Sequence, residues 1–110
     1  DILKIFKNNF SVAMMIDQRV TEGITIDFFN KPAFTTSIPA QLVKKFKCPI
    51  VPVHIQRKNN NDFEITINKP IYFENSEDIK SISKKLNFWL EEMISKNPEQ
   101  WIWSHNRWKL

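Results

Sequence analysis

The stretch Ser76–Lys96, SEDIKSISKKLNFWLEEMISK, carries the strongest helical pattern in the chain. Its apolar residues recur at three- and four-residue steps, as they do on the buried face of an amphipathic helix. Asn75 or Ser76 stands where an N-cap is expected, and Pro98 predicts that the helix ends near Lys96. We expect one long helix whose buried face comprises Ile79, Ile82, Leu86, Trp89, Leu90, Met93 and Ile94.

A further helix is expected in the stretch that follows, PEQWIWSHNRWKL (98–110), which holds three of the four tryptophans. Asn97 would be its N-cap, Pro98 its first residue and Gln100 the partner in a capping box. Tryptophans at helical spacing are typical of a packed face, whereas neighbouring cations suit anionic groups. We therefore expect Trp101, His105 and Trp108 to pack on one face, with Trp103 and Arg107 paired on a second. Arg107 and Lys109 would be free to meet anionic groups.

Strand patterns lie earlier in the sequence, before the long helix. FSVAMMID (10–17) is a continuous apolar run, typical of a strand buried on both faces. ITIDFF (24–29) alternates like a half-buried strand, and two runs about the polar KNNN (58–61) predict a hairpin, with Pro52 favouring an edge or a bulge.

Two helices complete the pattern, one over residues 2–6 and one over TTSIPAQLVKKFKC (35–48). In the second, hydroxyl residues supply the N-cap and Pro39 falls in the first turn, where it costs no hydrogen bond. Helices and strands in this order indicate an α/β fold, a mixed sheet flanked by helices.

Composition narrows the class of protein. The chain has 110 residues, 42% of them hydrophobic, which suits one domain or part of one. The net charge is +4, and residues 28–61 hold six cations and no acid, so an anionic partner is favoured unless these lysines form a solvated face. A single cysteine and two histidines make a structural metal site improbable, and no cofactor motif is present.

Four residues are candidates for binding an anionic or polar ligand. Asp17 and Gln18 directly follow an expected strand, where ligands bind in open α/β sheets, although Asp17 could instead accept hydrogen bonds from its own loop. Thr35 precedes an expected helix N-terminus and could help to bind an anion or only cap the helix. Arg57 could hold a phosphate or float at the hairpin. His105 lacks a nucleophile at useful spacing, so we expect it to pack and to donate to a carbonyl.

Three segments resemble the C-terminal half of a known family. In order and spacing, MIDQRVTEGITIDFFNKPAFTT (15–36), CPIVPVHIQRK (48–58) and PEQWIWSHNRWK (98–109) are similar to the late acyltransferases of lipid A biosynthesis. These lauroyl and myristoyl transferases of Gram-negative bacteria belong to the lysophospholipid (glycerolipid) acyltransferase superfamily. Asn30 stands where the family usually has glycine, and asparagine also adopts a left-handed turn.

The resemblance implies an enzyme that moves a fatty acyl chain from acyl carrier protein to a lipid A precursor, at the cytoplasmic face of the bacterial inner membrane. Catalysis in the family depends on a His-x-x-x-x-Asp/Glu motif, in which the histidine is a general base. Five residues after His54 stands Asn59, and five after His105 stands Leu110, so the motif is absent from this chain. Since the chain begins at Asp1, we expect residues 1–110 to be the C-terminal part of one acyltransferase domain, inactive without the upstream half.

The resemblance therefore assigns no catalytic residue to this chain. It implies supporting roles near the substrate for Asp17, Gln18, Thr35 and Arg57, and a closing cap formed by Trp101, His105, Arg107 and Trp108. The alternative is a basic membrane-surface or nucleic-acid-binding module without catalysis. Nucleic acid is the less favoured partner, because the tryptophans have helical spacing rather than the spacing of a stacking platform on a sheet.

Overall fold

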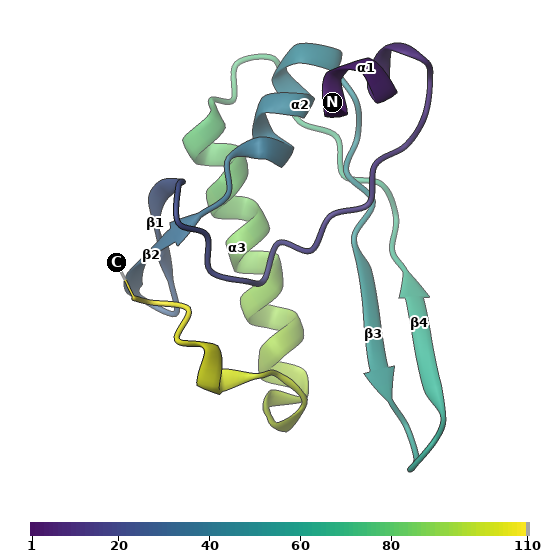
Figure 1. Ribbon diagram of the computed structural model, residues 1–110, viewed down its shortest axis with the longest axis vertical. Helices are drawn as coiled ribbons and strands as arrows, with labels where there is room; N and C mark the ends of the chain where they lie inside the picture. Colours follow the sequence, from purple (N-terminus) through teal and green to yellow (C-terminus); the bar gives the residue numbers. More distant parts are fainter. Residues whose placement is uncertain (110) are drawn as a thin grey trace.

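The computed structural model describes residues 1–109. Its helices and strands form an α/β arrangement, which confirms the expected fold class (Figure 1). The strands form two separate antiparallel pairs, β1 with β2 and β3 with β4. No helix among the described residues combines the length and the apolar character needed to cross a bilayer. The elements are α1 (Ile2–Lys7), β1 (Ile24–Phe28), β2 (Lys31–Thr35), α2 (Ile38–Phe46), β3 (Val53–Arg57), β4 (Phe63–Ile67), α3 (Ile79–Lys96) and the 3₁₀ turns η1 (Pro98–Gln100) and η2 (Trp103–His105).

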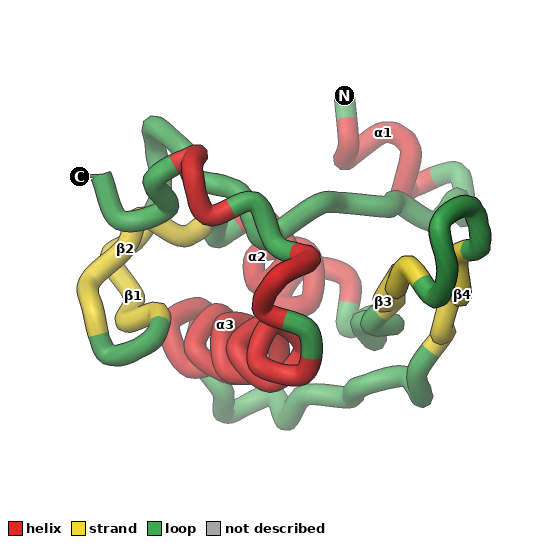
Figure 2. Tube along the Cα trace, turned by 90° about the horizontal axis from the view of Figure 1, so that it is seen from below, coloured by secondary structure: helices red, strands yellow, loops and turns green. Residues whose placement is uncertain are grey.

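Helix α3 is the axis of the molecule, with β1–β2 on one side and β3–β4 on the other (Figures 1 and 2). It ends at Lys96, as Pro98 predicts. Its N-cap is Asp78, not Asn75 or Ser76, because the Asp78 carboxylate accepts a hydrogen bond of 2.7 Å from the Ser81 N–H. That bond satisfies one of the N–H groups that a helix start leaves without a partner.

The β1–β2 pair is a tight hairpin joined by Phe29 and Asn30, both of which have positive φ, 50° and 59°. Two such residues make the turn that matches the twist of antiparallel strands, and Asn30 takes the left-handed conformation expected of it. Gly23 precedes the hairpin, and a Cβ there would lie 2.5 Å from the Thr35 carbonyl oxygen. Glycine thus permits the close approach of the chain to the end of β2.

Two groups of buried side chains hold α3 to its neighbours. Phe28 and Ala33 of the first hairpin pack with Leu90 and Ile94 of α3. Nearer the start of α3, Ala40 and Val43 of α2 pack with Ile82 and Leu86. Ile16 contacts both groups, so the segment before β1 joins them.

The expected strand over residues 10–17 is wrong. This segment is extended but pairs with no described strand, and Phe10 and Met15 are 66% and 76% exposed. A strand buried on both faces needs neighbours on both sides, and the described residues provide none. Conversely, β2 was not predicted, because Lys31 and Pro32 mask its short apolar pattern.

The expected hairpin about KNNN is confirmed as β3–β4, with Val53 opposite Ile67 and Arg57 opposite Phe63. Pro52 lies just before β3 at the edge, as its missing N–H requires. Its carbonyl oxygen still accepts a hydrogen bond of 2.9 Å from the Asn68 N–H, so the pairing continues past the end of β4.

Candidate functional site

The residues Trp101–Lys109, here called the C-terminal cap, do not form the expected helix. They follow η1 and include η2, and Asn106 then reverses the chain with φ 50°. The expected capping box is also wrong, because Asn97 makes no side-chain hydrogen bond to η1. A continuous helix would separate the tryptophans onto two faces, whereas the two short turns bring all three indoles to one cluster.

That cluster surrounds Phe28, the most buried aromatic residue of β1. Trp101 meets the Phe28 ring edge-on with centroids 5.9 Å apart, and Trp108 stacks on it at 5.7 Å. Trp103 is edge-on to Trp101 at 4.7 Å. Each indole N–H has an acceptor, which removes the cost of burying a polar group. These acceptors are the Asp17 carboxylate for Trp101 at 3.3 Å, the Pro98 carbonyl for Trp103 at 2.7 Å and the Phe28 carbonyl for Trp108 at 2.8 Å.

Arg107 is completely buried beneath this cluster, so the expectation that it is free to meet anions is wrong. Its guanidinium donates to the Phe34 carbonyl and, at 3.2 Å, to the Thr35 hydroxyl. It also lies 5.1 Å from the centre of the Phe28 ring, in cation–π geometry. Burial lowers the pKa of Arg107, and the negative charge of Asp17 partly opposes this shift. Arg107 thus ties the cap to both strands of the first hairpin.

Thr35 ends β2, three residues before α2 begins as expected, but it is buried and does not cap the helix. Its hydroxyl accepts from Arg107 and, at 3.0 Å, from the Asn87 amide, and it donates to the Ala33 carbonyl at 3.3 Å. All of its hydrogen-bonding capacity is therefore used within the protein. The start of α2 is served by Thr36, whose hydroxyl accepts from the Ile38 N–H at 3.4 Å.

Asp17 faces the same cluster from the extended segment before β1. It is half-buried and accepts from Trp101, whereas the adjacent Gln18 is exposed. Arg19 continues this contact by donating to the Lys109 carbonyl at 2.8 Å. The structure therefore brings Asp17 and Thr35 together with Trp101, Arg107 and Trp108, which lie more than sixty residues later in the sequence.

His105 is half-buried against the edge of Trp101, with ring centroids 5.1 Å apart. Its Nδ1 lies 2.5 Å from the Ile102 carbonyl oxygen. Because a carbonyl oxygen can only accept, Nδ1 carries the proton in this contact. The imidazole therefore holds the turn of η2 closed.

Arg57 is the one expected site residue that stands apart from the others, at the tip end of β3. Gln100 holds its backbone, accepting from the Arg57 N–H at 2.8 Å and donating to the Arg57 carbonyl at 3.1 Å. The guanidinium lies 5.4 Å from the centre of the Phe63 ring and is exposed. Arg57 therefore belongs to the second hairpin and not to the cluster around Asp17.

The sequence was compared with models of known protein families. Residues 1–110 match the family of bacterial lipid A biosynthesis acyltransferases. The chain belongs to this family. A comparison with individual curated proteins gave no match. The matched residues include those of the cluster, of both hairpins and of all three helices.

Two residues that contact the cluster around Phe28 were not predicted. Asn87 donates to Thr35 from the buried face of α3, and the Glu91 carboxylate accepts from the Phe29 N–H at 2.7 Å. A polar residue at a position of the apolar stripe was the signal for Asn87, because Ser83, Asn87 and Leu90 recur at helical steps. Nothing in the local sequence distinguishes Glu91 from the exposed acid beside it.

The cations of residues 28–61 do not form one basic surface. Lys31 lies on β2, Lys44, Lys45 and Lys47 on or at the end of α2, and Arg57 and Lys58 at the second hairpin, three separate parts of the molecule (Figure 1). Lys44 is also engaged, donating to the Asn75 and Glu77 carbonyls at 2.7 and 2.8 Å. A continuous phosphate-binding stripe would need these charges on one face.

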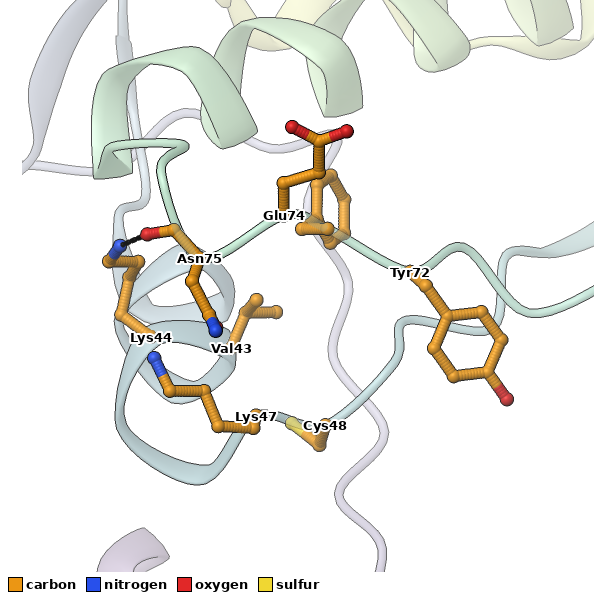
Figure 3. Close-up of a pocket in the computed structure, with 8 residues that line it drawn as sticks. Val43, Lys44, Lys47, Cys48, Tyr72, Glu74 and Asn75 are labelled. Atoms are coloured by element: carbon orange, nitrogen blue, oxygen red, sulfur yellow. Dashed lines mark hydrogen bonds between the residues drawn. The ribbon is translucent and has the colours of Figure 1, made fainter.

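A small cavity lies beside Lys44, between the end of α2 and residues 72–75 (Figure 3). Its volume is about 40 Å³, enough for a few water molecules and far below the several hundred Å³ of a typical small-molecule site. Cys48 lines it, and its thiol is directed to the Leu42 carbonyl at 3.7 Å. This cavity is too small for an acyl chain or a glycolipid.

Most polar side chains of the cluster are engaged within the protein. Among residues 1–109 no group of three histidine, cysteine or acidic side chains is placed to hold a metal ion. The Thr35 hydroxyl is engaged by neighbouring groups, whereas His105 bonds the Ile102 carbonyl through Nδ1 and has an Nε2 that is buried without a hydrogen-bond partner. The cluster holds Asp17 in a fixed position at the edge of a rigid aromatic surface.

Proposed function

We propose that this chain is the C-terminal module of an acyltransferase that moves a fatty acyl chain from acyl carrier protein to a lipid A precursor. The observation that carries the proposal is the match of all 110 residues to the lipid A acyltransferase family. We place the reaction at the cytoplasmic face of the bacterial inner membrane, where the acceptor is a membrane glycolipid and the donor is a carrier protein of the cytoplasm.

In this proposal the general base and its acid come from an upstream half of the same enzyme. The chain contains no His-x-x-x-x-Asp/Glu motif of its own. Its contribution is a preorganised wall, with Asp17 beside Trp101 and with Thr35 locked to Arg107. Fixed neighbours of this kind favour a reaction by holding the reacting groups in place.

The extended segment Ser11–Asp17 supports docking of the upstream half. Its side chains alternate between exposed and half-buried, as in a strand, with Val12, Met14 and Ile16 turned inward. No backbone group of this segment bonds to another backbone group within the described residues. An extended chain with free N–H and C=O groups can accept a strand from a partner.

The decisive experiment combines the chain with a polypeptide that carries the upstream half and its His-x-x-x-x-Asp/Glu motif. Acyl transfer from acyl carrier protein to a lipid A precursor is assayed for the chain alone, the upstream half alone and the pair. We expect transfer by the pair only. Transfer by the chain alone would contradict the proposed division of labour, and no transfer by a folded, associated pair would contradict the proposed function.

The supporting role of Asp17 is tested in the same assay. Asp17→Ala removes the carboxylate that positions Trp101, and we expect kcat/KM of the pair to fall about tenfold, as for loss of one positioning contact. Glu22→Ala, an exposed acid in the next loop, is the matched control and should leave kcat/KM unchanged. Equal effects of the two variants would remove Asp17 from the site.

A further inference from the structure

The β3–β4 hairpin carries large apolar side chains that no other part of the described chain covers. Residues alternate along both strands, so Val53 and Ile55 of β3 share a face with Phe63, Ile65 and Ile67 of β4. The exposed fractions of these five side chains lie between 51% and 72%. None of them belongs to either group of buried side chains around α3. This apolar face of the hairpin therefore contributes little to the core of the described domain.

The hairpin is held to the rest of the domain at a few points on its β3 side. The Gln56 side chain donates to the Asn97 side chain at 3.1 Å, and Gln100 bonds the Arg57 backbone. β3 lies between α3 and β4 (Figures 1 and 2), and all five residues of β4 are exposed. Because side chains alternate, β4 is exposed on both of its faces. A hairpin isolated in this way is marginally stable in water, whereas a third strand or a packed layer makes it stable.

The outer edges of the hairpin are also unpaired. Among residues 1–109, β3 and β4 pair only with each other, so the backbone groups that point away from the pair have no strand partner. The extended residues 11–17 share this property, and they run from beside the hairpin towards β1 (Figure 1). Three extended segments with unpaired backbone groups indicate parts of a larger sheet whose other strands lie outside the described chain.

We infer that the apolar face and the free edges of β3–β4 dock on the upstream half of the same acyltransferase domain. Strands of that half extend the sheet at the hairpin, and its apolar side chains cover Phe63, Ile65 and Ile67. In strand addition of this kind main-chain hydrogen bonds give affinity, and pockets for alternate side chains give specificity. The inference rests on the proposed function, which assigns the His-x-x-x-x-Asp/Glu motif to the upstream half.

Two other partners would leave part of the hairpin without a cover. A lipid bilayer could take up the apolar face, but lipid offers no hydrogen bonds to the unpaired N–H and C=O groups at the strand edges. A second copy of the chain could pair one edge in a two-fold arrangement, but it would bring the same unpaired segments and not the missing motif. The upstream half supplies strands, a covering layer and the catalytic residues together.

The first experiment co-expresses the chain with an affinity-tagged polypeptide that carries the upstream half, and it measures the share of the chain that co-purifies. We expect the wild-type chain to co-purify, and its failure to do so would overturn the inference. Ile65→Glu places a charge on the apolar face and should lower the co-purified share about tenfold or more. Phe88→Glu, a matched control on α3 whose side chain is 60% exposed, should leave it unchanged. Equal effects of the two variants would also overturn the inference.

A second measurement does not depend on how the chain tolerates a buried charge. The photo-reactive amino acid p-benzoylphenylalanine replaces Ile65 in one sample and Phe88 in another. The co-expressed pair is irradiated in the cell, and each product is identified by its mass. We expect a cross-link to the upstream half from position 65 and none from position 88. A cross-link from position 65 to a second copy of the chain, or to no protein at all, would overturn the inference.

These measurements report association and not acyl transfer, so the two proposals can fail separately. Association through position 65 in a pair that transfers no acyl chain would contradict the proposed function and support the inference. Acyl transfer by a pair whose association Ile65→Glu leaves unchanged would overturn the inference alone.

Discussion

The C-terminal cap and the β3–β4 hairpin both carry large apolar side chains, but they differ in how far these side chains are buried. In the cap, Trp101 and Trp108 pack around Phe28, Trp103 packs against Trp101, and every indole N–H has an acceptor. In the hairpin, five apolar side chains are exposed, and the Gln56 side chain and the Arg57 backbone hold it to the body. The difference indicates that the cap stabilises this domain, whereas the apolar face of the hairpin is available for contact with something else.

The largest expected effect is in the cap. Arg107→Ala leaves the Phe34 carbonyl and the Thr35 hydroxyl without their charged donor and opens a cavity under Phe28. We expect the free energy of unfolding in urea to fall by about 3–4 kcal/mol. Arg107→Lys keeps the charge but not the fork of donors, so it should restore only part of this loss. A change below about 1 kcal/mol for the alanine variant would contradict the role of Arg107 as the tie between cap and hairpin.

Within the cap, the tryptophans should differ in how much each contributes to the free energy of unfolding. Trp108→Ala removes the ring stacked on Phe28 and should cost about 2–3 kcal/mol in urea unfolding, less than a fully buried tryptophan. Trp103→Ala, which removes a more exposed indole with one hydrogen bond of its own, should cost about 1 kcal/mol. If the order were reversed, the cluster would be centred on Trp103 and not on Phe28.

The attachment of the hairpin should contribute less. Gln100→Ala removes both hydrogen bonds to the Arg57 backbone, and we expect a loss of about 1 kcal/mol or less because these groups are exposed. The sharper readout is hydrogen exchange, which should become faster in β3–β4 and stay unchanged in β1–β2. Glu99→Ala alters the adjacent exposed residue and serves as the control. Faster exchange throughout the domain would mean that the hairpin is not a separate unit.

The smallest effect is expected on the outer face of the hairpin. Ile65→Thr keeps a β-branched side chain and should change the free energy of unfolding by less than about 0.5 kcal/mol. Ile82→Thr makes the same substitution in the core of α3 and should cost about 2 kcal/mol or more. Similar losses at the two positions would show that Ile65 is packed in this domain, which would break the contrast with the cap.

Local patterns in the sequence predicted several elements correctly. The spacing of apolar residues predicted α3, because one helical face must be buried along its whole length. The alternation about KNNN predicted β3–β4, and Asn30 predicted the turn of the first hairpin. The run at residues 10–17 was misread because a continuous apolar pattern does not say whether neighbouring strands exist.

By itself the sequence determined which side chains are apolar along α3, where helix α3 ends, the hairpin about KNNN, and the resemblance to lipid A acyltransferases. Only the tertiary structure decided that Arg107 is buried rather than free, that Asp17 meets Trp101, and that Gln56 of the second hairpin meets Asn97 at the end of α3. The physical reason is the sequence separation over which each interaction acts. Periodicity and turn chemistry act over a few residues, whereas Trp101 and Arg107 find their partners more than seventy residues away, where the fold and not the neighbouring sequence places them.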